Sequence, residues 1–300
     1  MRILITGGLG FVGTQLSIRF IEKGHSVTVV GKDSNSMVHT PNEVEYIAAD
    51  TTTKGTWQEE IAHKDAVINL AGSSIFTRWN DKTKKLIHDS RILTTQNVVE
   101  AMVKGNNTIL CSASAAGYYG FHGDEELTEE AEAGNDFLAR LCVDWEDEAQ
   151  KAAYKGIRVI ITRFGIVLGK TGGALGKMIP AFKRFVGGPL GNGNQWFPWI
   201  HMEDLTSAFL FFLDQKEIHG PVNLCTPNPV RNKVLAQALG KALSRPSFLK
   251  TPAFMLRLVL GEFGSVLLEG QRAMPAKLIK HRFTFHYPEI AGALEELVRK

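Results

Sequence analysis

The sequence predicts an α/β fold, with a doubly wound parallel sheet and a smaller, partly helical C-terminal lobe. Through the first half of the 300 residues, short apolar segments alternate with amphipathic helical segments. The apolar segments have few polar residues, which is typical of parallel strands buried on both faces. Glycine is enriched, since 29 of the 300 residues are glycine, whereas glycine usually makes up about 7% of a protein. The placement of these glycines indicates where the chain turns and where it approaches a ligand closely.

Six strands and four helices are expected in the first half. The strands are short apolar runs bounded by glycine or polar residues: Arg2–Thr6, His25–Val30, Val44–Ala49, Ala66–Leu70, Asn107–Cys111 and Ile157–Arg163. The helices have apolar residues at helical spacing: Val12–Lys23, Trp57–His63, Lys82–Lys104 and Asp136–Tyr154. In the first helix Leu16, Phe20 and Ile21 share one face, and Gly24 ends it. The alternation predicts βα units whose strands end at a common edge of the sheet.

The pattern changes after Arg163, where nine glycines fall between Gly165 and Gly193. The elements expected there are the helices Leu175–Phe185, Glu203–Leu213, Val234–Leu243, Pro252–Leu260 and Glu289–Val298, and the strand Val222–Cys225. We therefore expect residues 1–164 and 200–226 to form the sheet domain. Residues 165–199 and 227–300 would form the smaller lobe, which shapes a substrate cleft.

Composition and charge exclude several classes of protein. The 34 basic and 31 acidic residues give a net charge of +3, so a nucleic-acid partner is not expected, although the last thirty residues are mildly basic. The cysteines Cys111, Cys142 and Cys225 suggest neither a disulfide framework nor a metal site. No apolar run reaches the roughly 18 residues of a membrane span. We expect a cytoplasmic protein with a small-molecule substrate and without a metal or a membrane partner; a homodimer is compatible with the sequence.

A glycine motif connects the first strand with the first helix. Residues 6–13 read Thr-Gly-Gly-Leu-Gly-Phe-Val-Gly, so Gly7, Gly10 and Gly13 have the spacing GxxGxxG. In this context Gly7 permits a tight turn, Gly10 the approach of a phosphate, and Gly13 close packing of helix and strand. The backbone amides around Phe11 and Val12 would then bind a diphosphate at the helix N-terminus. We predict dinucleotide binding on a Rossmann-type domain; the alternative is a purely structural turn.

The residues after the second and third strands indicate which dinucleotide is bound. NAD sites usually have an acidic residue near the end of the second strand, which bonds the ribose 2′-hydroxyl. Here Gly31 leaves space and Lys32 adds a positive charge, which favours NADP(H) over NAD(H). The alternative is that Lys32 is a solvated loop residue. Asp50, at the end of the third strand, would accept a hydrogen bond from the adenine amino group or cap a turn.

These residues resemble those of the extended short-chain dehydrogenases/reductases, which bind NAD(P) on a Rossmann domain. The resemblance covers nearly the whole chain and includes Asn69–Gly72, Ser112–Gly120 and Trp199–Leu205. A narrower resemblance is to the atypical, nucleoside-diphosphate-sugar epimerase-like branch, which has a C-terminal domain of undefined role. Its motifs here are Arg78-Trp79, Ser90-Arg91, Asp144–Glu146, Gly187–Gly191, Gln195-Trp196, Leu260–Glu262, Gly270–Arg272 and Pro275. The resemblance implies that Leu70, Ala71 and Gly72 lie against the cofactor.

The chain departs from this family in its catalytic pair. The family's chemistry normally uses a Tyr-x-x-x-Lys pair, in which the tyrosine exchanges a proton and the lysine lowers its pKa. None of the five tyrosines is followed four residues later by lysine. Aligning the helix places Leu138 and Cys142 at the usual positions, and Ser90 lies near the position of an expected asparagine. The resemblance therefore predicts cofactor binding better than it predicts turnover.

Two residues near the fifth strand are candidates for catalysis. Ser114 would bond a substrate carbonyl or hydroxyl, or would serve only as a small residue beside the cofactor. Tyr118 would donate a proton, the alternative being a packing role. Arg163, at the end of the sixth strand, would line the cofactor cleft or form a buried ion pair with the acidic helix.

Several large polar and aromatic residues stand in loop-like segments, where a core has little use for them. In open α/β sheets, loops at the carboxyl ends of strands form the ligand site. The predicted substrate residues are Arg78, Trp79, Tyr119, Gln195, Trp196, Trp199 and His201. Arg78 would bind a phosphate or carboxylate, and the tryptophans would stack on the substrate. Packing between the lobes is the alternative for the tryptophans, and a cap or core role for His201.

The sequence thus favours an NADP(H)-dependent oxidoreductase or epimerase-like enzyme. Its expected substrate is small and polar, either linked to a nucleotide or related to such a compound. The missing Tyr-x-x-x-Lys pair keeps open a second class, a non-catalytic NADP(H)-binding sensor or regulatory protein.

Overall fold

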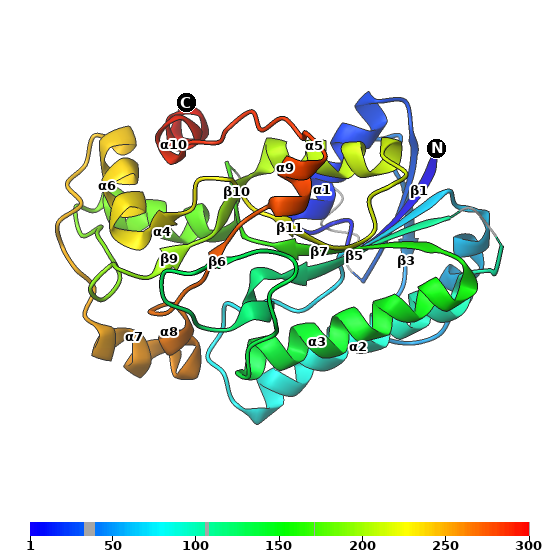
Figure 1. The fold of residues 1–300 in the computed structure, drawn as a ribbon, viewed down its shortest axis with the longest axis horizontal. Coiled ribbons are helices and arrows are strands. Elements are labelled where there is room, and N and C mark those ends of the chain that lie inside the picture. Colours follow the sequence, from blue (N-terminus) through cyan, green and yellow to red (C-terminus); the bar gives the residue numbers. More distant parts are fainter. Residues whose placement is uncertain (33–39, 106–107, 171, 300) are drawn as a thin grey trace.

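The computed structural model describes residues 1–32, 40–105, 108–170 and 172–299. Its centre is a seven-stranded sheet in the order β11-β7-β5-β4-β1-β2-β3, and every neighbouring pair in it is parallel. The strands are β1 (Arg2–Thr6), β2 (Ser26–Gly31), β3 (Glu45–Ala48), β4 (Ala66–Asn69), β5 (Ile109–Ala115), β7 (Arg158–Phe164) and β11 (Gly220–Leu224). This confirms the doubly wound α/β class, and Figure 1 shows the strands fanning across the middle of the molecule.

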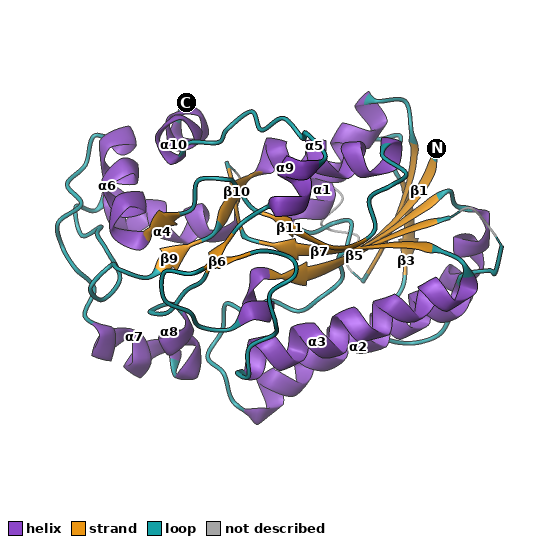
Figure 2. Ribbon diagram, in the orientation of Figure 1, coloured by secondary structure: helices purple, strands orange, loops and turns teal. Residues whose placement is uncertain are grey.

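Helices cover both faces of the sheet, as Figure 2 shows. One layer contains α1 (Phe11–Glu22) and α5 (Met202–Asp214); the other contains α2 (Asp81–Ala101), α3 (Phe137–Gln150) and a 3₁₀ helix, Thr56–His63. Ile3 and Ile5 of β1 belong to the core under α1 and α5, whereas Leu4 belongs to the core under α2 and α3. Alternate residues of one apolar strand thus enter two separate cores, which explains why nearly every residue in these strands is apolar.

The second lobe has its own core. It is built from α4 (Gly173–Lys183), α6 (Asn232–Leu243) and α10 (Ile290–Val298), around Phe182, Leu235 and Leu294. Short strand pairs border it: β8 (Ile166–Gly169) with β10 (Trp199–His201), and β9 (Trp196–Phe197) with β12 (Val230–Arg231). Helices α7 (Ala253–Leu260) and α8 (Glu262–Val266) form its lower part in Figure 1. The sequence did not predict these two- to four-residue strands because they are too short to show a period.

The chain passes between the two lobes more often than the sequence suggests. Strand β6 (Glu126–Leu127), in the first half of the chain, pairs with β13 (Arg272–Ala273), near the C-terminus. After β13, helix α9 (Ala276–Lys280) returns to the sheet, and its Leu278 is fully buried in the core under α1 and α5. Residues 276–285 therefore pack with the sheet domain, whereas the division predicted above assigns them to the smaller lobe. Within the described residues, no helix is long and apolar enough to cross a membrane.

Element boundaries differ from the expectations at a few ends. Strand β5 runs on to Ala115 because its small residues Ser112, Ala113 and Ser114 continue the buried extended pattern; the expected start at Asn107 lies outside the described residues. Helix α3 ends at Gln150, and a 3₁₀ helix over Lys151–Lys155 completes the predicted segment.

Candidate functional site

The glycine motif forms a tight loop between β1 and α1, the predicted anion-binding loop. Gly7 has a positive φ of +67°, and its N–H donates to the carbonyl of Val30 in the neighbouring strand. Gly10 is the extended N-cap residue of α1; it offers no side-chain cap, and the first helical turn has no acidic residue. A Cβ on Gly13 would lie 2.6 Å from the carbonyl oxygen of Gly7, so only glycine fits there. Because the first amides of a helix have no intrahelical acceptor, this end fits a diphosphate.

The loop after β4 lies directly against the glycine motif. A Cβ on Gly7 would be 2.9 Å from the Cα of Ala71, so the two loops touch through their backbones. Asn69, fully buried at the end of β4, accepts from Thr6 and donates to Thr95 and Ser112. These hydrogen bonds connect β1, β4, β5 and α2, and they hold the carboxyl ends of three strands in register at the cleft. Leu70, Ala71 and Gly72 follow at this edge, where the sequence analysis expects the cofactor.

The adenosine end of the predicted site contains Gly31, Lys32 and Asp50. The Lys32 ammonium lies 2.7 Å from a carboxylate oxygen of Asp50, and both side chains are exposed. Asp50 also accepts from the backbone and the hydroxyl of Thr52, so it closes a turn as well. Partial burial raises the pKa of Asp50, but the bonds from Lys32 and Thr52 outweigh it and hold the pKa below its usual value. A cation therefore lies at the end of β2 and β3, as the sequence predicts, and Asp50 keeps it there.

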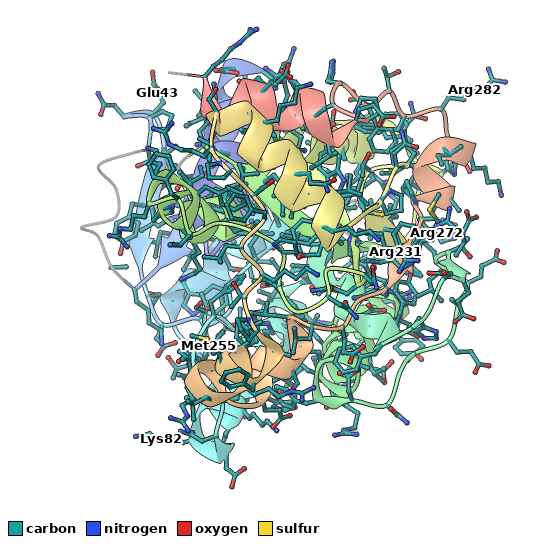
Figure 3. All side chains as sticks on the ribbon, turned by 90° about the vertical axis from the view of Figure 1, so that its left-hand side faces the viewer. Glu43, Lys82, Arg231, Met255, Arg272 and Arg282 are labelled. Atoms are coloured by element: carbon teal, nitrogen blue, oxygen red, sulfur yellow. The ribbon has the colours of Figure 1, made fainter. Side chains whose placement is uncertain are left out.

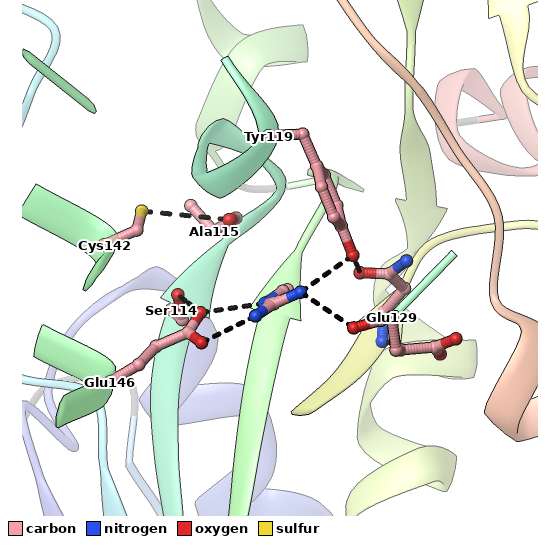
Figure 4. A network of polar contacts seen from close by, with 8 residues as sticks. Ser114, Ala115, Tyr119, Glu129, Cys142 and Glu146 are labelled. Atoms are coloured by element: carbon pink, nitrogen blue, oxygen red, sulfur yellow. Dashed lines mark hydrogen bonds and ion pairs between the residues drawn. The ribbon is translucent and has the colours of Figure 1, made fainter. Parts of the chain in front are cut away.

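A buried polar network fills the ends of β5 and β7 (Figure 4). Arg163, 3% exposed, forms a bidentate pair with Glu146 of α3, at 2.9 Å from Nε and 2.8 Å from Nη2. Its Nη1 donates to the hydroxyl of Tyr119 and to the carbonyl of Glu129. The ring of Tyr118 lies flat on the guanidinium, 3.4 Å from Cζ to the ring centroid. The buried ion pair, the alternative stated for Arg163, is what the structure shows, and all of its nitrogens are occupied.

Ser114 belongs to the same network. Its hydroxyl donates to Oε1 of Glu146 at 2.6 Å, and the residue is 3% exposed. Tyr119 is fully buried, and its hydroxyl donates to Asn223 of β11. Tyr119 therefore offers no exposed surface for the substrate contact that was expected of it, because it packs with Leu127, Cys225 and Ala273. Ser114 supports Glu146 in this structure, and its catalytic role stays a prediction.

The loop tryptophans pack inside the protein. Trp79 is 7% exposed and lies between the rings of Phe137 and Phe263, with its indole N–H on the carbonyl of Ile75. Trp199 is fully buried in the core of the second lobe. The expectation that these two residues stack on substrate is wrong for this conformation, since no free ring face remains. The alternative, packing between and within the lobes, is observed instead.

The side chains of Trp196 and Gln195 also make their contacts within the protein. Arg231 and Arg272 lie on Trp196, at 4.3 Å and 5.0 Å from the ring, and Figure 3 shows these two arginines close together. The Trp196 indole N–H donates to Asp124. Gln195 donates to the carbonyls of Leu190 and Leu267 and so joins two loops of the lobe. Arg78 differs, because it is exposed; its Cγ and Nε lie near Gly261.

Comparison with known proteins agrees with this geometry. Residues 3–225 match the family model described as the NAD dependent epimerase/dehydratase family. The chain belongs to this family. Residues 251–297 match a second model, a domain of unknown function called DUF1731.

Relatives match along the full chain. The chloroplastic epimerase family protein SDR39U1 homolog of Arabidopsis thaliana is 38% identical, over 100% of this chain and 87% of that protein. The epimerase family protein YfhF of Bacillus subtilis is 36% identical, over 99% of this chain and 98% of that protein. The crystal structure of human epimerase family protein SDR39U1 (isoform 2) with NADPH superposes with a TM-score of 0.86 at 31% identity, covering 99% of both chains.

Both Leu138 and Cys142, which the sequence comparison predicts at the positions of the family's tyrosine and lysine, lie in α3. Leu138 lies against Gly117, and the thiol of Cys142 is directed at the carbonyl of Ala115. Burial, reinforced by the charge of Glu146, raises the pKa of Cys142 to about 12, so this thiol is not a nucleophile near neutral pH. Neither side chain replaces the proton transfer of the tyrosine. Among the described residues, no group of three or more His, Cys, Asp or Glu side chains is arranged to hold a metal ion.

His201 stands at the start of α5, and it borders the same cavity as Phe11 of α1. It caps α5, because its Nδ1 accepts from the N–H of Glu203, and its Nε2 lies 3.2 Å from Glu296 of α10. It is 4% exposed and borders a cavity of 420 Å³ that is lined by α1, α5 and α10. The cap role stated as an alternative is therefore observed, and a substrate contact of His201 stays a prediction.

The burial of His201 predicts a pH effect on stability. Burial lowers its pKa below the usual value, and the nearby carboxylates do not overcome this. As pH falls below about 6.5, the unfolded chain therefore binds a proton before the folded protein does, and the free energy of unfolding decreases. His201→Asn keeps the helix cap but removes this titration. Urea unfolding between about pH 6.5 and pH 5 should show a shallower decrease for the variant.

Exposed His63 offers a matched control for this experiment. His63→Asn should keep the wild-type pH dependence. Equal slopes for His201→Asn and the wild type would contradict the assignment of this acid sensitivity to His201.

One residue beside Gly72 was not among the predicted site residues. Arg91 of α2 lies over Gly72, with its guanidinium carbon 2.9 Å from where a Cβ on that glycine would be. The signal was available, because Arg91 follows Ile87 by four residues and precedes Val98 by seven, on the buried face of α2. A charged residue on the apolar side of a helix needs an explanation.

Proposed function

We propose that this protein binds NADP(H) across the carboxyl ends of its sheet. In this proposal it is an oxidoreductase or epimerase-like enzyme for a small polar, nucleotide-linked or related, substrate. The observation that carries the proposal is the uncapped start of α1 behind Gly7, Gly10 and Gly13, in a chain that superposes on a relative crystallised with NADPH. A cytoplasmic location and a homodimeric state stay predictions.

The described residues have separate tasks in this proposal. The amides at the start of α1 bind the diphosphate, and Lys32, held by Asp50, binds the 2′-phosphate. When bound, the nicotinamide supplies or accepts the hydride. The network of Arg163, Glu146 and Ser114 holds the ends of β5 and β7 rigid beside it.

Tyr118 is the residue that we propose for proton transfer. Its ring is fixed on Arg163, and its hydroxyl has no hydrogen-bond partner among the described residues. The hydroxyls of Ser114 and Tyr119, by contrast, are committed to Glu146 and Asn223. Tyr118 is thus the hydroxyl at this strand end that is free to exchange a proton with a substrate.

Turnover separates the enzyme from the second candidate function, a non-catalytic NADP(H) sensor. The prediction that Leu138 and Cys142 take the positions of the catalytic pair favours the sensor, and the sequence, in which no tyrosine is followed four residues later by lysine, supports it. NADPH oxidation should be followed with a panel of carbonyl compounds and nucleoside-diphosphate sugars. Oxidation with any of them supports the enzyme, whereas tight binding without oxidation across the whole panel supports the sensor.

Lys32 gives a direct test of the cofactor. Lys32→Ala removes the cation at the end of β2 and should weaken NADPH binding about 10-fold, the loss expected for one charge-assisted hydrogen bond. NADH binding should not change, because NADH has no 2′-phosphate. The dissociation constants are measured by titration calorimetry.

Lys54 provides the matched control for this test. It is an exposed lysine paired with Glu100 at 2.6 Å, as Lys32 is paired with Asp50 at 2.7 Å. Lys54→Ala should bind both nucleotides like the wild type. If Lys32→Ala weakens NADPH and NADH equally, the assignment of Lys32 to the 2′-phosphate is wrong.

A further inference from the structure

Arg91 is a cation on the buried face of α2 that lacks an anionic partner. Its Nη1 donates to the carbonyls of Ile87, at 2.9 Å, and Ser73, at 3.1 Å. Its Nε and Nη2 donate to no atom in the described part of the chain, where no carboxylate oxygen lies within the 4.0 Å of an ion pair either. Burial lowers the pKa of the guanidinium to about 10, so it still carries its charge at neutral pH.

Two other arginines, buried Arg163 and half-buried Arg158, show how this protein neutralises such a charge. Arg163 has the carboxylate of Glu146. Arg158 donates to the carbonyls of Phe212, Gln215 and Ile218, at the C-terminal end of α5, which has a partial negative charge. Arg91 has neither arrangement, because Ile87 is inside a helix and Ser73 is in a loop. Arg91 is only partly buried, so its two uncommitted nitrogens remain able to bind an anion.

The position of Arg91 indicates where the anion would lie. The guanidinium lies flat on Gly72, with Cζ at 2.9 Å and both terminal nitrogens at 3.2 Å from the Cβ position of that glycine. Gly72 follows Ala71, which touches Gly7 of the anion-binding loop. On its other side, the ring of Trp145 in α3 lies 5.2 Å from the guanidinium. Arg91 therefore stands next to the proposed diphosphate site, on the side toward α2 and α3.

We propose that Nε and Nη2 of Arg91 bind a phosphate or carboxylate oxygen in the cleft at Gly72. The anion is either the diphosphate of bound NADP(H) or an acidic group on the substrate; both present the same oxygen chemistry to a guanidinium fork. If the anion is the diphosphate, the inference rests on the proposed function. If the anion is a group on the substrate, the inference extends the proposed function, because the substrate is then an anion. Gly72 is required because any side chain there would displace the guanidinium.

The test compares Arg91→Gln with the wild type in three titrations. The probes are NADPH, 2′-AMP, which lacks the diphosphate, and inorganic phosphate added to protein saturated with NADP⁺. Arg158→Gln is the matched control, because it also removes a half-buried guanidinium that donates to carbonyls. Arg158 lies at the start of β7, whereas the proposed site lies at the carboxyl ends of the strands. Melting temperatures are recorded for each variant. Arg91→Lys keeps the charge without the planar fork and provides a second variant if Arg91→Gln does not fold.

Two results support the proposal and identify the source of the anion. If the anion is the diphosphate, Arg91→Gln weakens NADPH binding about 10- to 100-fold and leaves 2′-AMP binding unchanged. If it is a group on the substrate, NADPH binding is unchanged, but the variant loses the phosphate binding that the nucleotide-saturated wild type shows. Arg91→Lys should show the same loss by a smaller factor, and Arg158→Gln should show neither.

Two other results overturn one proposal each. If Arg91→Gln binds NADPH and phosphate like the wild type, Arg91 only connects α2 to the loop at Ser73, and the inference is wrong. If the wild type itself does not bind NADPH, the proposed function is wrong. The phosphate titration, repeated without nucleotide, then decides the role of Arg91 by itself.

Discussion

Gly10→Asp should abolish NADPH binding while leaving the protein as stable as the wild type. Gly10 is the N-cap residue of α1, with the extended conformation that aspartate adopts at this position. An aspartate cap is about a few tenths of a kcal/mol more stabilising than a glycine cap, which roughly offsets the tight 3.2 Å contact of its Cβ with the carbonyl oxygen of Gly7. Its carboxylate, however, takes the place of the diphosphate. A like charge at about 4 Å costs about 4 kcal/mol at an effective dielectric constant of about 20, or roughly 1,000-fold in affinity.

The measurements for this variant are urea unfolding and NADPH titration. Gly10→Asn is the matched control, because it caps the helix equally well and has the same shape without the charge. It should keep more of the NADPH affinity than Gly10→Asp does. If both variants bind NADPH like the wild type, the anion site is not at the start of α1.

Arg163→Met should have the largest effect on stability. The substitution leaves Glu146 nearly buried without its bidentate partner, and Tyr119 and Glu129 each lose a donor. Removing one member of a buried ion pair costs about 3–5 kcal/mol. The free energy of unfolding, from urea denaturation, should decrease by that amount. Adding Glu146→Leu should recover most of the loss, since an apolar pair of similar volume is often neutral.

Arg2→Met is the control for Arg163→Met. Arg2 pairs with Asp65 at 3.3 Å, but both side chains are exposed. The loss of such a pair costs about 1 kcal/mol or less. A decrease of similar size for both variants would mean that the network at the end of β5 and β7 contributes little to stability.

The sheet domain could be predicted because its sequence signals are local. Ile3, Leu4 and Ile5 alone indicate a strand buried on both faces, and the glycines at 7, 10 and 13 fix the turn into α1. The position of Lys32, directly after its strand, is an equally local signal, and its role at the 2′-phosphate stays a prediction. Each of these signals depends on neighbours within a few residues, so no knowledge of the tertiary structure was needed.

The roles of the tryptophans could not be predicted, because their partners are far away in the sequence. Trp79 packs on Phe263, and Trp196 lies between Arg231 and Arg272. A large ring in a glycine-rich loop has the same local sequence whether it packs on the protein or on a ligand. Arg91 shows the converse: its position on the buried face of α2 is evident from the sequence, but the missing counter-charge is evident only in three dimensions.

The return of the chain through β13 and α9 means that the two matched regions are not separable modules. The match to DUF1731 begins at residue 251, yet Leu278 from within it completes the core beneath α1 and α5. The carbonyls of Ala273 and Met274 also accept from Cys225 and Asn223 of the first region. A fragment that stops at residue 250 would lack Leu278 and would therefore expose the apolar surface of the sheet domain that this residue covers. This architecture favours the inheritance of both regions as one unit, and it restricts where a homologous segment could be exchanged.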